Sequence, residues 1–110
     1  MPGTESPAAP MPDLTERQKR HLRGLAHALK PVVRLGNAGL TAAVLREMAR
    51  ALEDHELIKV KAPGADREAR EALFAALARE SGSALVQRIG HVAVYYRPRA
   101  EAPRLVIPDA

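Results

Sequence analysis

The first regular pattern of apolar and polar positions runs from Thr15 to Leu29 and has the period of an α-helix. One side of this helix would pack on a core, and the other side is basic and faces solvent. Pro31 ends the helix, because the residue before a proline avoids helical backbone angles. The inner side comprises Gln18, Leu22, Leu25, Ala26 and Leu29, and the basic side comprises Arg17, Arg20, Arg23 and His27.

Four short segments predict β-strands. In one of them, residues 57–61, apolar residues alternate with Lys59 and Lys61, which places both lysines on one face. Gly90 and His91 separate the last two strands, a spacing that fits a tight hairpin in which glycine supplies a positive φ. The four segments are residues 32–36, 57–61, 84–89 and 92–97.

Two further helices are predicted between the strands. Thr41 is in position to cap the second helix, and Asp66 is in position to cap the third, which Ser81 and Gly82 end. The resulting order, αβαβαββ, predicts an α/β fold: a single compact domain with a four-stranded mixed sheet. Strands joined through a helix would be parallel neighbours, and the final hairpin would add an antiparallel pair.

Composition divides the chain into one domain and two tails. Residues 1–13 contain four of the nine prolines and little to bury, so we expect a disordered tail. Residues 14–98 form the domain. Residues 99–110 form a loosely held C-terminal tail, in which only the apolar residues 105–107 are able to pack.

The overall composition excludes several classes of protein. The chain has 110 residues, which suits one domain, and 46% of them are hydrophobic. Without cysteine there is neither a disulfide nor a thiolate nucleophile. We find no secretion signal and no apolar stretch approaching the roughly 18–20 residues of a membrane span. We therefore expect a cytoplasmic protein that does not contact membranes.

Positive charge is concentrated in particular segments. The net charge is +4, but residues 14–35 contain six Lys or Arg and a single acid. Residues 57–65 and 83–99 contain Lys or Arg and no acid. Such segregation favours the capture of a polyanion.

A short glycine-bracketed sequence, Gly36-Asn37-Ala38-Gly39, lies between a predicted strand and a predicted helix. Glycine permits close approach to the backbone, and a helix N-terminus attracts anions, so this loop is a candidate phosphate site. The loop lacks the lysine of a nucleotide-hydrolysing P-loop and the pattern of a dinucleotide fold. A purely structural turn, an RNA clamp and a free-nucleotide site all remain open on this pattern alone.

The other candidate residues predict little chemistry. The acidic run from Glu53 to Glu56 is consecutive, so its side chains fan around a helix end and would be solvated instead of binding metal. The histidines are dispersed, and no catalytic set converges. Tyr95 and Tyr96 point to opposite faces of the last strand, and we expect one in the core and one on the surface. We expect neither a cofactor nor enzymatic activity.

The sequence "LTERQKRHLRGLAHALKPVVRLGNAGLTAAVLREMARALEDHELIKVK" resembles the first half of a bacterial single-domain CRM protein, the chloroplast RNA splicing and ribosome maturation domain. "VQRIGHVAVYYRP" resembles that family's final hairpin, and the likeness covers residues 14–99. It implies an RNA-binding αβαβαββ domain similar to the C-terminal domain of translation initiation factor three. It also implies association with the precursor of the large ribosomal subunit.

The residues and the resemblance together predict a monomeric RNA-binding protein that grips ribosomal RNA in the cytoplasm. The middle of the family's loop often includes a lysine, whereas Asn37 and Ala38 are uncharged here, so neighbouring cations must supply the attraction. We expect these cations to gather around the loop. A protein–protein adaptor with a basic face and a small nucleotide-binding protein are the alternatives. The predicted RNA-binding residues are Lys19, Arg20, Arg23, Lys30, Arg34, Gly36, Asn37, Ala38, Gly39, Lys59 and Lys61.

Overall fold

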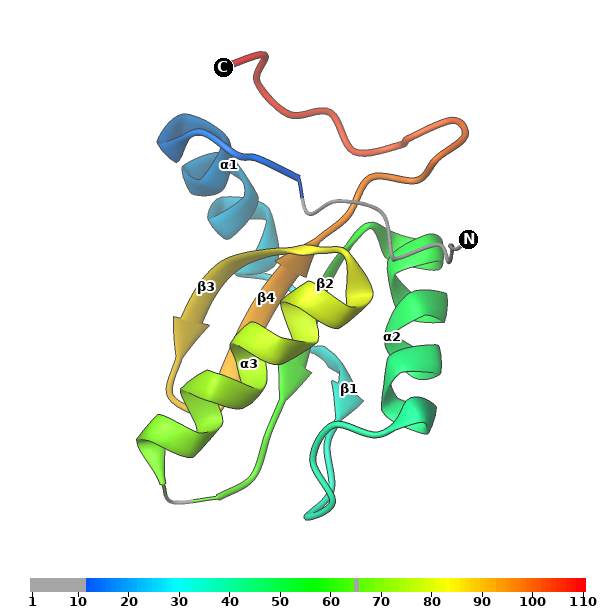
Figure 1. The fold of residues 1–110 in the computed structure, drawn as a ribbon. Helices are drawn as coiled ribbons and strands as arrows, with labels where there is room; N and C mark the ends of the chain where they lie inside the picture. Colours follow the sequence, from blue (N-terminus) through cyan, green and yellow to red (C-terminus); the bar gives the residue numbers. More distant parts are fainter. Residues whose placement is uncertain (1–11, 65) are drawn as a thin grey trace, which may run out of the picture.

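The computed structural model describes residues 12–64 and 66–110, and within them the chain has the predicted order αβαβαββ (Figure 1). Most of the tail expected at residues 1–13 lies outside the described residues. The elements are α1 (Glu16–Ala26), β1 (Pro31–Arg34), α2 (Ala42–His55), β2 (Leu57–Lys61), α3 (Arg67–Ser81), β3 (Ala84–Ile89) and β4 (Val92–Tyr96).

The four strands form one mixed sheet in the order β1-β2-β4-β3. β1 and β2 are parallel, as expected for strands connected through a helix, and β4 is antiparallel to both of its neighbours. Gly90 has a φ of +58° in the hairpin between β3 and β4, which confirms the predicted use of glycine there. The predicted caps are also present, since Thr41 caps α2 and Asp66 caps α3.

The sheet is covered on both faces, and residues 12–64 and 66–110 form two hydrophobic clusters, one on each face. α2 and α3 pack on one face, where α3 crosses in front of the sheet in Figure 1, through Met48, Leu52, Phe74 and Leu77. α1 packs on the other face. The second cluster comprises Leu22, Ala26, Leu57, Val86, Val94 and Tyr96.

Because both faces are covered, the expectation of one surface tyrosine is wrong. Tyr95 lies between the sheet and α3, where its hydroxyl donates a hydrogen bond to the carbonyl of Phe74 at 2.8 Å. Tyr96 points the opposite way and is buried in the α1 cluster. Burial raises the pKa of both phenols. Neither ring is free to stack on a base.

α1 is shorter than the sequence pattern suggests. It begins with a capping box between Thr15 and Gln18 and ends at Ala26, three residues before the expected end. Leu22 and Ala26, one turn apart, are the residues of α1 that are fully covered by the sheet. Leu25 and Leu29, predicted on the inner side, are 40% and 38% exposed.

The C-terminal segment, residues 99–110, folds back over the α1 side of the molecule and differs from the expected loose tail. Leu105 and Ile107, in the stretch 105–107 that we expected to be able to pack, do pack against the α1 cluster. The side chain of Gln18 donates a hydrogen bond to the carbonyl of Pro108 at 2.8 Å. His21 Nε2 lies 3.1 Å from the carbonyl oxygen of Val106.

Glu56 holds this segment in place, although we expected it at a solvated helix end. Glu56 is 1% exposed, and its carboxylate accepts hydrogen bonds from the backbone N–H groups of Arg99, Arg104 and Leu105 at 2.8–2.9 Å. Burial alone would raise the pKa of Glu56, but the three N–H donors and the charge of Arg99 outweigh it and hold that pKa below its usual value. One residue of the acidic run, Glu56, is therefore buried and structural, and nothing in the sequence of the run sets it apart from its exposed neighbours.

Candidate nucleic-acid interface

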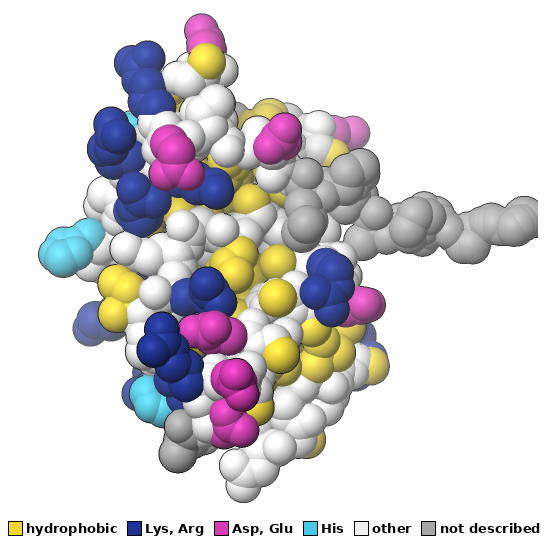
Figure 2. Space-filling model, turned by 60° about the vertical axis from the view of Figure 1, so that its left-hand side comes forward, with side chains coloured by type: hydrophobic (Ala, Val, Ile, Leu, Met, Phe, Trp, Pro, Cys, Tyr) yellow, Lys and Arg dark blue, Asp and Glu magenta, His cyan; other side chains and the backbone are white. Residues whose placement is uncertain are grey.

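The outer side of α1 carries the first group of positive charges. Figure 2 shows Lys and Arg side chains gathered over α1 at the upper left with an acidic side chain among them, and several acids beside the Lys and Arg side chains lower in the view. Arg17 and Arg20 are exposed. Lys19 lies 3.8 Å from Glu16 and lines a separate depression beside α3, so it does not share the orientation of its neighbours.

A second group of positive charges lies on the sheet itself, on the same face as α1. Leu57 packs under α1, so the strand pleat places Lys59 and Lys61 on that face further along β2. Arg34 pairs with Lys61 across the parallel β1–β2 ladder. We call Arg34, Lys59 and Lys61 the basic sheet group.

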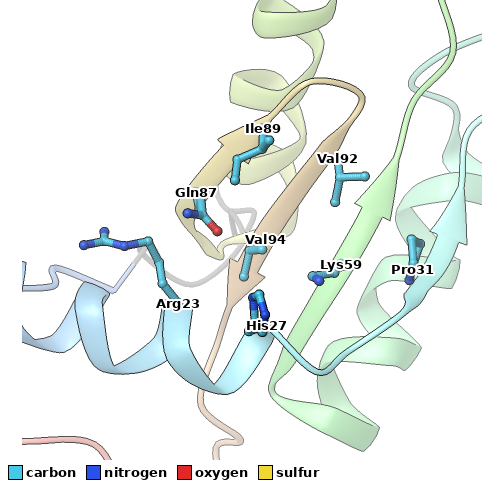
Figure 3. Close-up of a pocket in the computed structure, with 8 residues that line it drawn as sticks. All are labelled: Arg23, His27, Pro31, Lys59, Gln87, Ile89, Val92 and Val94. Atoms are coloured by element: carbon cyan, nitrogen blue, oxygen red, sulfur yellow. The ribbon is translucent and has the colours of Figure 1, made fainter.

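The basic sheet group is accessible because α1 covers only part of its face of the sheet. A groove of about 330 Å³ opens beyond the end of the helix. Figure 3 shows His27, at the end of α1, next to the side chains of Lys59 and Val94, while the guanidinium of Arg23 extends outward. The groove is lined by Arg23, His27, Pro31, Lys59, Gln87, Ile89, Val92 and Val94.

An irregularity in β3 determines what this groove contains. The register between β3 and β4 shifts between Leu85 and Gln87, as at a β-bulge. Val86 packs in the α1 cluster and Gln87 lines the groove, so these consecutive residues share one face. Arg88 consequently turns to the α3 side, where it lies 3.5 Å from Glu71.

The glycine turn, Gly36 to Gly39, follows the basic sheet group directly. Its ends are joined by a hydrogen bond from the N–H of Gly39 to the carbonyl of Gly36 at 3.1 Å. Gly39 has a φ of +69°, whereas Gly36 has no positive φ and open space where a Cβ would stand. Asn37 and Ala38 are exposed. The first turn of α2, which follows, contains no acid, so its positive dipole end is not neutralised locally.

The structure divides the predicted residues into separate groups. Arg34 and Lys61 are strand partners next to the glycine turn. Leu35, the residue before the turn, donates a backbone hydrogen bond to the carbonyl of Lys61 at 2.9 Å. Lys59 and Arg23 line the groove on the same face.

The expectation that all the cations surround the turn does not hold for Lys19, Arg20, Arg23 and Lys30, and Arg23 lies at the end of α1, beside the groove. Lys19 and Arg20 belong to the first half of α1, which lies at the opposite end of the molecule from the loop between β1 and α2 (Figure 1). Lys30 lines a different depression, beside Leu29 and His55. The reason is geometric, because α1 runs away from the turn.

Sequence reasoning missed three residues of the groove. Gln87 is brought to this face by the shift in β3, which leaves no clear sequence signal. His27 caps the C-terminus of α1 and was treated only as part of a polar helix side. Ile89 is 66% exposed. Its position directly before the hairpin glycine could have indicated an exposed apolar residue, because the end of a hairpin extends into solvent.

Comparison with known proteins places this α/β domain in a family. The family model described as the CRS1 / YhbY (CRM) domain matches residues 14–97. The chain therefore belongs to the CRM domain family, which confirms the resemblance seen in its sequence. Among the described residues, no helix has the length and apolar character to cross a membrane, and no cluster of possible metal ligands is present.

Curated relatives and a solved structure agree with this assignment. An RNA-binding protein of Haemophilus influenzae is 54% identical over 92 residues, spanning 84% of this chain and 93% of that protein. The probable RNA-binding protein YqeI of Bacillus subtilis is 38% identical over 95 residues, spanning 86% of this chain and 99% of YqeI.

The solution structure of hypothetical protein SAV1595 from Staphylococcus aureus, described as a candidate RNA-binding protein, superposes with a TM-score of 0.76. It is 34% identical in sequence and covers 87% of this chain and 100% of its own. The similarity confirms the predicted fold. The names of these relatives are those of RNA-binding proteins and not of enzymes, in agreement with the expectation of a non-enzymatic chain.

Proposed function

We propose that this protein binds RNA through the basic sheet group and the adjacent glycine turn, with the outer side of α1 extending the contact. The observation that carries the proposal is the position of Arg34, Lys59 and Lys61 on one accessible face beside an exposed turn. Within the described part of the chain none of the three makes an ion pair, so no acid neutralises their charges. The names of the relatives support RNA as that ligand.

The geometry favours contacts with the RNA backbone. Lys and Arg side chains spaced along one face meet successive phosphates, and the exposed turn offers N–H groups where no bulky side chain intervenes. Lys59 is already held in place, since its ammonium donates a hydrogen bond to the carbonyl of Leu29 at 2.9 Å. Binding of this kind discriminates shape and charge more than sequence.

We further propose that the RNA is ribosomal RNA in the precursor of the large ribosomal subunit, bound by a monomer in the cytoplasm. This partner rests on the likeness to bacterial CRM proteins. The test is sedimentation of cell extract containing the tagged protein. We expect the protein to sediment with large-subunit precursors, and equal recovery with small-subunit particles would refute this partner.

The salt dependence of RNA affinity tests the binding surface. With roughly 3–5 phosphate contacts, a plot of log K against log salt should have a slope of about −2 to −3.5 on single strands, because each contact releases counterion. Replacing Arg34 and Lys61 together with Ala should weaken binding and make the slope shallower by about 1.4. Fluorescence anisotropy with labelled RNA gives both quantities.

A matched control removes the same charge elsewhere. Arg50 on α2 and Arg79 on α3 are exposed, and their double Ala variant should retain the wild-type slope. If the slope of log K against log salt becomes shallower by the same amount in both double variants, the effect is one of net charge alone, and the proposed surface is wrong. A protein–protein adaptor would show no RNA binding, and a nucleotide-binding protein would show saturable binding of ATP or GTP with little effect of salt.

A further inference from the structure

The groove beyond the end of α1 has an apolar base that phosphate contacts do not use. Pro31, Val92 and Val94 line it, and Ile89 forms one wall (Figure 3). Ile89 is 66% exposed, although a β-branched residue of this size is normally buried. The volume of about 330 Å³ lies within the range of small-ligand sites, about 300–1,000 Å³. The groove therefore offers a planar apolar group a surface to rest on.

An amide side chain, that of Gln87, also lines the groove. The shift in β3 brings Gln87 into the groove, and no described residue forms a hydrogen bond with its side chain. An amide carries both donors and an acceptor, the combination that pairs with the edge of a nucleobase. An apolar surface with one amide is a site for a heterocycle and not for a bare phosphate.

The edge of the groove is positively charged. Arg23, His27 and Lys59 line it, and none of its described lining residues is acidic. In Figure 3 Arg23 extends outward from α1, while Lys59 lies on the opposite side of His27. Charges at the edge and apolar residues inside match a nucleotide, whose phosphate is charged and whose base is not.

We propose that this groove binds one unstacked base of a single-stranded RNA, with Gln87 on the base edge and the flanking phosphates at Arg23 and Lys59. The proposal rests on the proposed function and adds to it a contact with a base. A base within a duplex is stacked and paired, so it cannot enter. The protein should consequently prefer unpaired segments over continuous helices.

The test compares a short single-stranded RNA of mixed sequence with the same oligomer lacking all of its bases. Both carry the same phosphates, so a purely electrostatic protein binds them equally. We expect the intact RNA to bind about fivefold more tightly, which corresponds to about 1 kcal/mol from burying roughly 40 Å² of apolar surface. The double variant Gln87→Ala/Ile89→Ser should abolish this difference. Ile89 is largely exposed, so the substitution removes little buried area.

The matched control is Val106→Ser, which removes an apolar side chain that is 82% exposed in the C-terminal segment. This variant should keep the preference for intact RNA. Equal binding of intact and abasic RNA by the wild type would overturn the base site while leaving RNA binding in place. A preference that survives Gln87→Ala/Ile89→Ser would show that the base is bound elsewhere, and would also overturn it. Failure of both oligomers to bind would instead overturn the proposed function.

Discussion

At the scale of single residues, the two glycines of the loop have different roles, although the sequence pattern treats them alike. Gly39 adopts a left-handed backbone with φ +69°, which an L residue with a Cβ adopts at a cost of about 1–2 kcal/mol. Gly36 has no positive φ and no neighbour within 4 Å of a Cβ. Gly39 therefore shapes the turn, and Gly36 leaves its surface open.

Alanine substitutions separate these roles. Gly39→Ala should lower the free energy of unfolding by about 1 kcal/mol, because the left-handed backbone becomes strained. Gly36→Ala should leave that free energy unchanged but weaken RNA binding, because the added methyl group stands on the proposed contact surface. Urea denaturation and anisotropy measure the two effects. Equal loss of stability in both variants would contradict the division, and so would undiminished RNA binding by Gly36→Ala.

At the scale of elements, the sequence was sufficient for the order of helices and strands and insufficient for their surroundings. Periodicity and caps identified α2, α3 and the hairpin, because these signals are local. Which helices pack on each face of the sheet depends on tertiary structure. The burial of Tyr96 under α1 could therefore not be predicted from the pattern of apolar and polar residues. Glu56 shows the same limit, since its partners are more than 40 residues away.

The Glu56 carboxylate makes attachment of the C-terminal segment depend on pH. Its pKa is lower in the folded protein than its usual value of 4.5, so the ionised form is the one that the fold stabilises. This stabilisation is fully present above that usual value and is lost as the pH falls through the lower, folded pKa. We expect the amide protons of Arg104 and Leu105 to lose protection from hydrogen exchange in that acidic range, before the sheet amides do.

The substitution Glu56→Gln should produce the same detachment at neutral pH. The amide keeps one acceptor oxygen and places a donor against backbone N–H groups, at a cost of about 1–3 kcal/mol. Glu53→Gln, an exposed residue of the same helix, is the control and should behave as the wild type. Wild-type protection at Leu105 in Glu56→Gln would show that apolar packing alone holds the segment.

At the scale of the whole molecule, the sequence indicated a basic protein but not how its charges are distributed in space. Segment charge and the loop motif pointed to Arg34, Lys59 and Lys61, and strand pairing places these three on one face beside the turn. Lys19 and Lys30 carry the same charge but line other depressions, one beside α3 and one beside His55, although Lys30 directly precedes Pro31, the strand partner of Lys59. Charge counted along a chain contains no information about the direction of a helix.

The most direct test of the central claim is an NMR titration of the isotope-labelled protein with single-stranded RNA, following every backbone amide. We predict that the largest shifts fall on the glycine turn and on Arg34, Lys59 and Lys61, with smaller shifts along the outer side of α1. The solvent-facing amides of α2 and α3 should not move. Shifts concentrated on α2 or α3, with the glycine turn unaffected, would contradict the account.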